Sequence, residues 1–392
     1  MNLSRHRTRS RKVTTLVGAA AVLGLATTTL AGTAFADYAP SATDVVSVSG
    51  ATPQYAADFV ANGDTNGDAG YNSAGNVNRY VNFDATADGN GRDAYANGST
   101  LASPVPLNPS VVYRAGSNAV QRLQSSGADL TALLSDTAAV ERINFAVVAS
   151  LPTAPQQTTA VNNGWGGLHV VQLGTDPEVI VTPNTSNAPA GLSAAELVGI
   201  YSGTYVHWND IPGNSGGSSD AIIPLIPPST SSIYKTLVAD LKTANGGTAV
   251  TLAASVKTVE QNDPGAVTAA GPDAIAPFAQ SRLNLYASGY FLNPATAPYP
   301  GGAPLSAGVK VISGTAPDSS ASYSDTNGVY AVFRQSDLAS STPWQPGATK
   351  NWVQVLLSST SGTPFFKGAA GQALVAAGGD IPGYNDLGVV HS

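Results

Sequence analysis

Short apolar runs alternate along the chain with segments whose apolar residues recur at helical spacing. The apolar residues 45–48 lead through the small residues 49–52 into a segment, 53–60, in which Tyr55 and Phe59 share one helical face. This order predicts a strand, a small-residue turn and a helix. Backbone N–H groups at the start of such a helix, together with nearby hydroxyls, form a favourable place for an anion.

The same order of strand, turn and helix recurs further along the chain. The predicted strands, turns and helices lie at 111–113, 125–128 and 129–134, and again at 222–226, 227–232 and 233–242. Residues 143–148 predict another strand. Because strands alternate with helices throughout, we expect the α/β fold class.

A helix is also predicted between Ser193 and Gly203, with Ser193 as its N-cap and Gly203 at its end. In contrast, residues 61–104 are rich in Asn, Asp, Gly and Ser. This composition is typical of turns, and we expect a long surface insertion there.

The N-terminus has the pattern of an export signal. A basic segment is followed by an apolar run from residue 13 to about residue 30, and Ala34-Phe35-Ala36 then supplies small residues before Asp37. The alternative is a retained membrane anchor, since the run is nearly long enough to span a bilayer. The small-residue site favours cleavage after residue 36. We therefore expect a secreted, extracellular protein that does not span the membrane after cleavage.

Composition narrows the function classes further. Of 392 residues, 43% are hydrophobic and 11% charged, which allows a large core, and there are no cysteines. Disulfides, thiolate catalysis and a lipidated cysteine are thereby excluded. Without residues 1–36, which hold five Lys and Arg and no acid, 13 cations face 25 acids, a net charge of −12. Such a chain is not expected to bind nucleic acid.

Two stretches resemble the phosphate-binding component of bacterial phosphate ABC importers. The first comprises Leu192-Ser193, Leu197, Ile200-Tyr201, Gly203 and Trp208-Asn209-Asp210, and the second is the glycine-flanked helix pattern at 371–379. The resemblance implies a type II periplasmic-binding-protein fold, in which two lobes joined by crossing strands hold a ligand between them. On this basis we expect lobe 1 to comprise 37–178 and 285–392, and lobe 2 to comprise 179–284.

The resemblance also implies which residues bind the ligand. Carried over residue by residue, the binding turns give Ser49, Gly50, Ala51, Thr52, Ser125, Ser126, Gly127, Ser150, Thr230, Ser231 and Ser232. The third of these turns is expected at 147–150, but it is mostly apolar. The fourth departs most, because Ile233 and Tyr234 stand where the family has Thr and an anion-gripping Arg. Lys235 is expected to point elsewhere and to be a poor substitute.

Several other motifs suggest a functional role but also fit a purely structural one. Residues 213–217 fit the G-x-S-x-G formula of hydrolases, but the flanking sequence predicts a flexible loop instead. Residues 64–68 carry side-chain oxygens at the spacing of the first three ligand positions of a calcium loop. The later positions lack the glycine and the glutamate that such a loop requires, so a solvated turn fits better. Arg114 either offers charge to an anion or forms a surface salt bridge. His207 either touches ligand or caps a helix, and residues 162–170 form either a wall of the site or a tight turn.

Together these features predict an exported solute-binding protein that captures a small, anionic, phosphate-like ligand in a divergent pocket. No catalytic residues, metal or cofactor are expected, an ABC permease is the implied partner, and we expect a monomer. The ligand alternatives are phosphate or a close oxyanion, another small solute, or no tightly bound ligand. The alternative from another class is a secreted structural or interaction protein that keeps the scaffold and has lost tight binding.

Overall fold

The computed structural model describes residues 38–64, 67–85, 110–123, 125–138, 140–288, 290 and 307–392. The predicted export signal at 1–36 lies outside these ranges. By its internal contacts, Asp37–Ser392 forms one unit. None of the helices in the described ranges is long and apolar enough to cross a bilayer.

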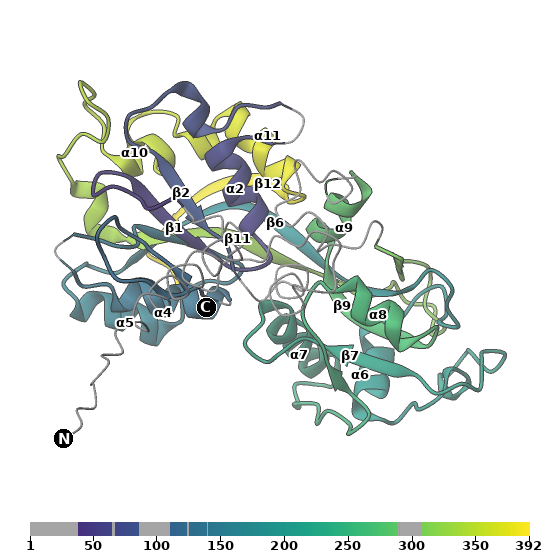
Figure 1. Cartoon of the computed structure of the whole chain (residues 1–392). Helices are drawn as coiled ribbons and strands as arrows, with labels where there is room; N and C mark the ends of the chain where they lie inside the picture. The colour runs from purple at the N-terminus through teal and green to yellow at the C-terminus, as the bar shows by residue number, and fades with distance from the viewer. Residues whose placement is uncertain are drawn as a thin grey trace, which may run out of the picture. The chain divides into compact units, whose positions relative to one another are not determined.

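A long mixed sheet organises this unit (Figure 1). Its strand order is β2-β1-β5-β11-β6-β9-β7-β8, and β10 and β12 also pair with β6. Strands β1, β2 and β5 are parallel to one another, as are β7, β8 and β9, while β6 and β11 run antiparallel to their neighbours. The strands are β1 Val45–Ser49, β2 Tyr80–Phe83, β5 Phe145–Val148, β6 Leu168–Pro183, β7 Ile223–Ile226, β8 Lys257–Thr258, β9 Ala274–Ala279, β10 Val309–Val311, β11 Ser324–Arg334 and β12 Ile381–Gly388, with β3 Ser110–Val111 and β4 Val120–Gln121 forming a separate pair.

The helices begin and end close to the predicted positions. In α6, the Ser193 hydroxyl accepts from the Glu196 amide at 3.1 Å, and Gly203 ends the helix with φ of 78°. The α-helices are α2 Gln54–Asn62, α4 Ser126–Ser135, α5 Ala154–Asn162, α6 Ala194–Ser202, α7 Ser232–Ala244, α8 Pro264–Ala270, α9 Gln280–Ala287, α10 Trp352–Leu356 and α11 Ala369–Ala377. The 3₁₀ turns are η1 Tyr71–Ala74, η2 Trp208–Asp210, η4 Gln335–Ala339, η5 Ser359–Ser361 and η6 Phe365–Lys367. The predicted α/β class is confirmed.

The sheet around β1 and β5 is covered on both faces. Helices α2, α10 and α11 pack on one face, and α4 and α5 pack on the other (Figure 1). Along β5, Phe145 and Val147 enter the first of these cores, while Ala146 and Val148 enter the second. A strand buried on both faces needs a continuous apolar run. This explains why residues 147 and 148 are apolar: they belong to the strand, and the turn predicted at 147–150 begins two residues later.

A second pair of cores surrounds β7 and β9. Helices α6 and α7 pack on one side of these strands, and α8 contributes Val267 to the other. Ile180 on β6 and Tyr323 beside β11 join the same cluster as α6. The apolar core therefore has two parts, and β6 and β11 continue from one to the other, as expected for a two-lobed fold.

The interpretation of 61–104 as a surface insertion is wrong for part of its length. Residues 80–83 form β2, which pairs in parallel with β1, and Tyr80 is fully buried. Tyr80 stacks on Phe145 with ring centroids 5.4 Å apart. The polar residues on either side of this four-residue edge strand are typical of loops, so the sequence did not predict it. Residues 86–109 lie outside the described ranges.

Trp208 gives the first testable prediction. Its side chain is fully buried in the core between α6 and β7, and its indole N–H donates to Asp273 at 2.7 Å. Trp208→Ala should lower the free energy of unfolding by about 3–5 kcal/mol because it leaves a large cavity. Trp208→Phe keeps most of the apolar contact and should cost clearly less. Urea titrations of both variants measure this; equal losses would contradict a packing role.

Candidate functional site

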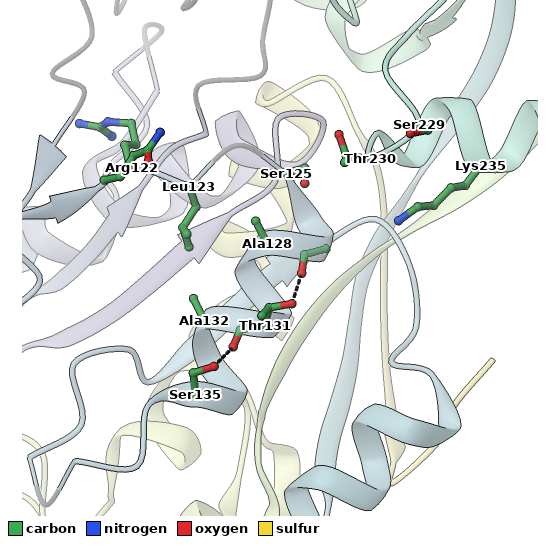
Figure 2. Close-up of a pocket in the computed structure, with 12 residues that line it drawn as sticks. Arg122, Leu123, Ser125, Ala128, Thr131, Ala132, Ser135, Ser229, Thr230 and Lys235 are labelled. Carbon is green, nitrogen blue, oxygen red and sulfur yellow. Dashed lines mark hydrogen bonds between the residues drawn. The ribbon is translucent and has the colours of Figure 1, made fainter.

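A pocket of about 820 Å³ opens beside the first turns of α4 and α7 (Figure 2). Residues from both elements contribute to its lining, together with the segment that follows β4. The lining residues are Gln121, Arg122, Leu123, Ser125, Gly127, Ala128, Thr131, Ala132, Ser135, Ser229, Thr230 and Lys235. Among these described lining residues none is acidic. Its charged lining residues are Arg122 and Lys235.

Three of the predicted ligand-binding residues line this pocket: Ser125, Gly127 and Thr230. The other predicted residues do not line it; they are Ser49, Gly50, Ala51, Thr52, Ser126, Ser150, Ser231 and Ser232. Ser231 and Ser232 directly follow Thr230, so the fourth turn reaches the pocket mainly through its first residues. Ser150 is exposed and lies in the turn before α5, whose N-terminus is capped by Thr153 and Gln156.

The first two predicted turns pack directly against each other. A Cβ added to Gly50 would lie 2.1 Å from the Ser126 hydroxyl oxygen, so only glycine fits at this approach. The Ser126 hydroxyl accepts from the Ala149 amide at 3.2 Å, and the Ser49 hydroxyl accepts from the Asn82 side chain at 2.8 Å. Both hydroxyls are therefore held inside the structure, where they connect neighbouring loops.

Three other hydroxyls in these turns have a different environment. Thr52 and Ser231 are 5% and 3% exposed, and neither buried hydroxyl oxygen has a hydrogen-bond partner among the described residues. Ser125, which is 7% exposed, is the N-cap residue of α4, but its side chain makes no capping hydrogen bond. Buried polar groups are usually paired, and unpaired ones call for an explanation such as a bound ligand. Each of the three lies at the start of a helix: α2, α4 or α7.

Lys235 brings a positive charge to the pocket, contrary to expectation. It points from α7 toward the first turn of α4, and its Nζ lies 3.6 Å from the position that a Cβ on Gly127 would take (Figure 2). Side chains on a helix tilt toward its N-terminus, and Lys235 lies one turn after the N-cap Ser231. Its ammonium therefore reaches back to the start of the helix. No ion pair of Lys235 occurs within the described part of the chain.

Two nearby charges bear on the electrostatics of the pocket. Arg122 lines it too, but its guanidinium is paired with Asp84. Asp129 lies in the first turn of α4 and is fully buried, and neither of its carboxyl oxygens has a hydrogen-bond partner in the described ranges. Burial raises the pKa of Asp129 well above its usual range, which favours the neutral acid. Asp129 thus does not offset the positive field at the start of α4.

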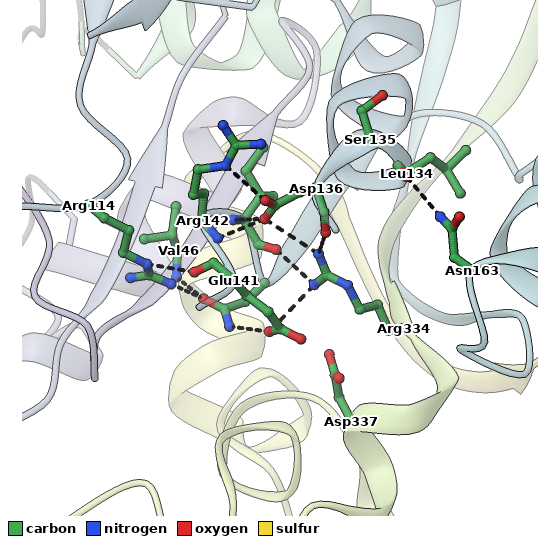
Figure 3. A network of polar contacts seen from close by, with 12 residues as sticks. Val46, Arg114, Leu134, Ser135, Asp136, Glu141, Arg142, Asn163, Arg334 and Asp337 are labelled. Atoms are coloured by element: carbon green, nitrogen blue, oxygen red, sulfur yellow. Dashed lines mark hydrogen bonds and ion pairs between the residues drawn. The ribbon is translucent and has the colours of Figure 1, made fainter. Parts of the chain in front are cut away.

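Arg114 takes no part in this pocket, and neither interpretation of it holds. It is buried, and it donates to the backbone carbonyls of Glu141 at 2.7 Å and Asp44 at 2.9 Å and to the Asn144 side chain at 2.8 Å (Figure 3). These contacts connect the starts of β1 and β5. Arg114 therefore has a structural role.

The remaining motifs form turns and caps. Residues 213–217 form a loop rather than a strand-to-helix elbow. His207 precedes η2, where its amide donates to Asp210 at 2.7 Å. Within 162–170, residues 163–167 make a tight turn between α5 and β6, with φ of 83°, 74° and 125° at Gly164, Gly166 and Gly167. All three features are accounted for by local structure.

A metal site finds no support in the described residues. Within those ranges, no three His, Asp or Glu side chains gather in a group that could hold a metal ion. In the loop at 64–68, which has part of a calcium-loop pattern, the Asp68 amide donates to the Asp64 carboxylate at 2.8 Å, as in an Asx turn. Thr65 and Asn66 lie outside the described residues.

Comparison with known proteins identifies one family. A model described as the PBP superfamily domain matches residues 38–360. Comparison with curated proteins gives no match.

Three solved structures illustrate what the chain is similar to. A putative phosphate ABC transporter substrate-binding protein with bound phosphate, from Clostridium perfringens, is 11% identical; the match covers 87% of this chain and 100% of that one, with a TM-score of 0.48. An ABC-type phosphate transport receptor from Vibrio cholerae is 13% identical, with coverage of 86% and 100% and a TM-score of 0.46. A possible phosphate binding protein from Planctomyces limnophilus is 10% identical, with coverage of 86% and 92% and a TM-score of 0.42.

Proposed function

Because the chain belongs to the PBP superfamily, we propose that it is an exported solute-binding protein that holds a small anionic ligand beside the first turns of α4 and α7. The observation that carries this proposal is Ser125, which lines the pocket without capping its helix, beside Lys235 in the same lining. Thr52 and Ser231 are also buried without partners among the described residues, at the starts of α2 and α7, but they do not line the pocket. Hydroxyls and backbone N–H groups of this kind are suitable donors to an oxyanion.

The finer features of the proposal follow from the sequence. Phosphate or a close oxyanion is the first ligand to test, since the motifs at 191–213 and 371–379 resemble phosphate-binding importer components. Export follows from the signal pattern at 1–36, and an ABC permease is the partner if uptake is the purpose. We propose a monomer with two lobes. Lobe 1 comprises residues 37–178 and 285–392, and lobe 2 comprises residues 179–284. Reversible binding, without catalysis, is the proposed activity.

One observation favours the alternative, a secreted interaction protein that has lost tight ligand binding. The hydroxyls of Ser49 and Ser126 are hydrogen-bonded internally, and the first predicted turn does not line the pocket. Isothermal titration separates the two functions. The probes are inorganic phosphate, sulfate and phenyl phosphate, added to protein freed of ligand by unfolding and refolding. Binding of any of these anions in the micromolar range supports the solute-binding protein, and absence of heat with all three supports the alternative.

Two adjacent serines provide a matched test of the pocket. Ser125→Ala should weaken binding of the anion at least tenfold, because a donor hydrogen bond to a charged group contributes about 1.5–3 kcal/mol. It should leave the stability of the free protein unchanged, since this hydroxyl makes no capping bond. Ser126→Ala should do the reverse: it removes the acceptor of the Ala149 amide and should cost about 1 kcal/mol of stability. Titration and thermal unfolding of both variants measure these effects; unaltered affinity in Ser125→Ala would count against this pocket.

A further inference from the structure

We propose that Lys235 anchors the charged group of the ligand and that the rest of the pocket selects an organic anion over an inorganic one. This inference rests on the proposed function, which it makes more specific. In this inference the Lys235 ammonium on α7 takes the anion-binding role of the arginine that the family has and this sequence lacks. It also predicts that the ligand extends from its anionic group along the surface of α4.

The first step of the argument is electrostatic. The Lys235 ammonium lies against the first turn of α4, 3.6 Å from the Cβ position of Gly127. The first N–H groups of a helix lack intrahelical partners and carry partial positive charge. Lys235 is exposed to solvent, and an anion placed between its ammonium and these N–H groups would interact favourably with both. No acidic side chain lines the pocket in the described ranges, and Lys235 forms no ion pair there. The start of α4 and Lys235 therefore offer a bound anionic group two positive partners.

The second step concerns the hydroxyl beside this charge. Ser125 is 93% buried, lines the same pocket and makes no capping hydrogen bond with α4. Its side chain is thus available to an anion that Lys235 attracts. Gly127 leaves the backbone of the first turn uncovered, because it has no side chain to stand between the ammonium and the N–H groups. Together they form a three-part binding site of ammonium, hydroxyl and backbone N–H groups.

The third step concerns the size and character of the remaining space. The pocket volume of about 820 Å³ lies in the range, roughly 300–1,000 Å³, that is typical of sites for organic ligands. Beyond the first turn, its wall is one face of α4, formed by Ala128, Thr131, Ala132 and Ser135 at helical spacing. From Ala128 to Ser135 this face extends about 10 Å at 1.5 Å per residue. An inorganic oxyanion would leave this wall uncovered, whereas an organic anion could cover its alanines.

Phenyl phosphate and inorganic phosphate test this proposal, because both carry a phosphoryl group and phenyl phosphate has an apolar phenyl ester in place of one hydroxyl. Isothermal titration of the wild-type protein should give at least tenfold tighter binding of phenyl phosphate. Equal or tighter binding of inorganic phosphate would overturn the inference and leave the proposed function supported. Absence of binding by either anion would overturn both the inference and the proposed anion site.

Variants separate the two ends of the pocket. Lys235→Met should weaken binding of phenyl phosphate at least tenfold and reduce its dependence on salt. Lys242→Met changes the same residue type at the far, exposed end of α7 and should leave binding unchanged. Ala132→Phe should weaken binding of phenyl phosphate more than that of inorganic phosphate. Unchanged affinity in Lys235→Met, with the fold intact by circular dichroism, would overturn the role of Lys235.

Discussion

Replacing Arg334 by Met is expected to lower the free energy of unfolding by about 3–5 kcal/mol, as found when one partner of a buried ion pair is removed. Arg334, at the end of β11, has a side chain that is only 2% exposed. It donates to the carbonyl oxygens of Ile143 at 2.9 Å and Asp136 at 2.8 Å (Figure 3). Its guanidinium also lies over the Trp165 ring, 4.6 Å from the centroid. Met fills the space but leaves these acceptors unpaired.

Arg142→Met is the matched control, because both arginines approach the Asp136 carboxylate: Arg334 at 3.5 Å from within the structure, and Arg142 from the solvent side. Its Nε lies 2.8 Å from Asp136, and its side chain is 45% exposed. Asp136 itself is buried, but its carboxylate also accepts from the backbone amides of Arg142 and Ile143, which Arg142→Met leaves in place. This variant should therefore lose clearly less stability than Arg334→Met. Guanidinium titration of both variants gives the comparison. Similar small losses for the two would show that Arg334 is not the connection between β11 and the end of α4.

The order of strands and helices could be predicted because local patterns and burial agree. Strands covered on both faces, such as β5, need unbroken apolar residues, and helices such as α6 carry clear caps at Ser193 and Gly203. Strand β2 could not be predicted in this way. Only Tyr80 and Phe83 of its four residues are buried, and the surrounding Asn and Asp residues are typical of loops.

The turns that line the pocket were partly predictable for a similar reason. A hydroxyl-rich segment before a helix is visible in the sequence, and Ser125 and Thr230 from two such segments line the pocket. Which hydroxyls are already paired depends on contacts between distant segments, as for Ser126 with Ala149. The sequence does contain one signal for Lys235: it lies four residues after the N-cap Ser231, on the same side of the helix. The lysine side chain is long enough for its ammonium to reach back to the start of the helix.

Stability should also be greater at pH 5 than at pH 8, because several buried carboxyls favour the protonated form. Burial raises the pKa of Asp176 to about 6 and, with the nearby charge of Glu141, that of Asp337 to about 7. Burial likewise raises the pKa values of Asp129, Glu178 and Asp380 well above their usual range. Between pH 4 and pH 7 the folded protein therefore holds protons that the unfolded chain has released. Stability must then fall as pH rises through these values.

Asp380→Asn isolates one of these groups. Asp380 is 4% exposed, and neither of its carboxyl oxygens has a hydrogen-bond partner among the described residues. Burial raises its pKa most, the charge of Asp176 raises it further, and Arg282 opposes both effects. Asn resembles the protonated acid in shape and cannot ionise. The variant should therefore equal wild type in stability at pH 4 and be more stable than wild type at pH 8.

Thermal unfolding from pH 4 to pH 8 measures this difference, with Asp68→Asn as the control at an exposed position. The control should follow the wild-type curve throughout. If Asp380→Asn also followed that curve, or were less stable at pH 8, then Asp380 would be ionised in the folded state and stabilised by Arg282. The sign of the difference at pH 8 thus decides between desolvation and ion pairing at this position, since the first favours the neutral acid and the second its carboxylate.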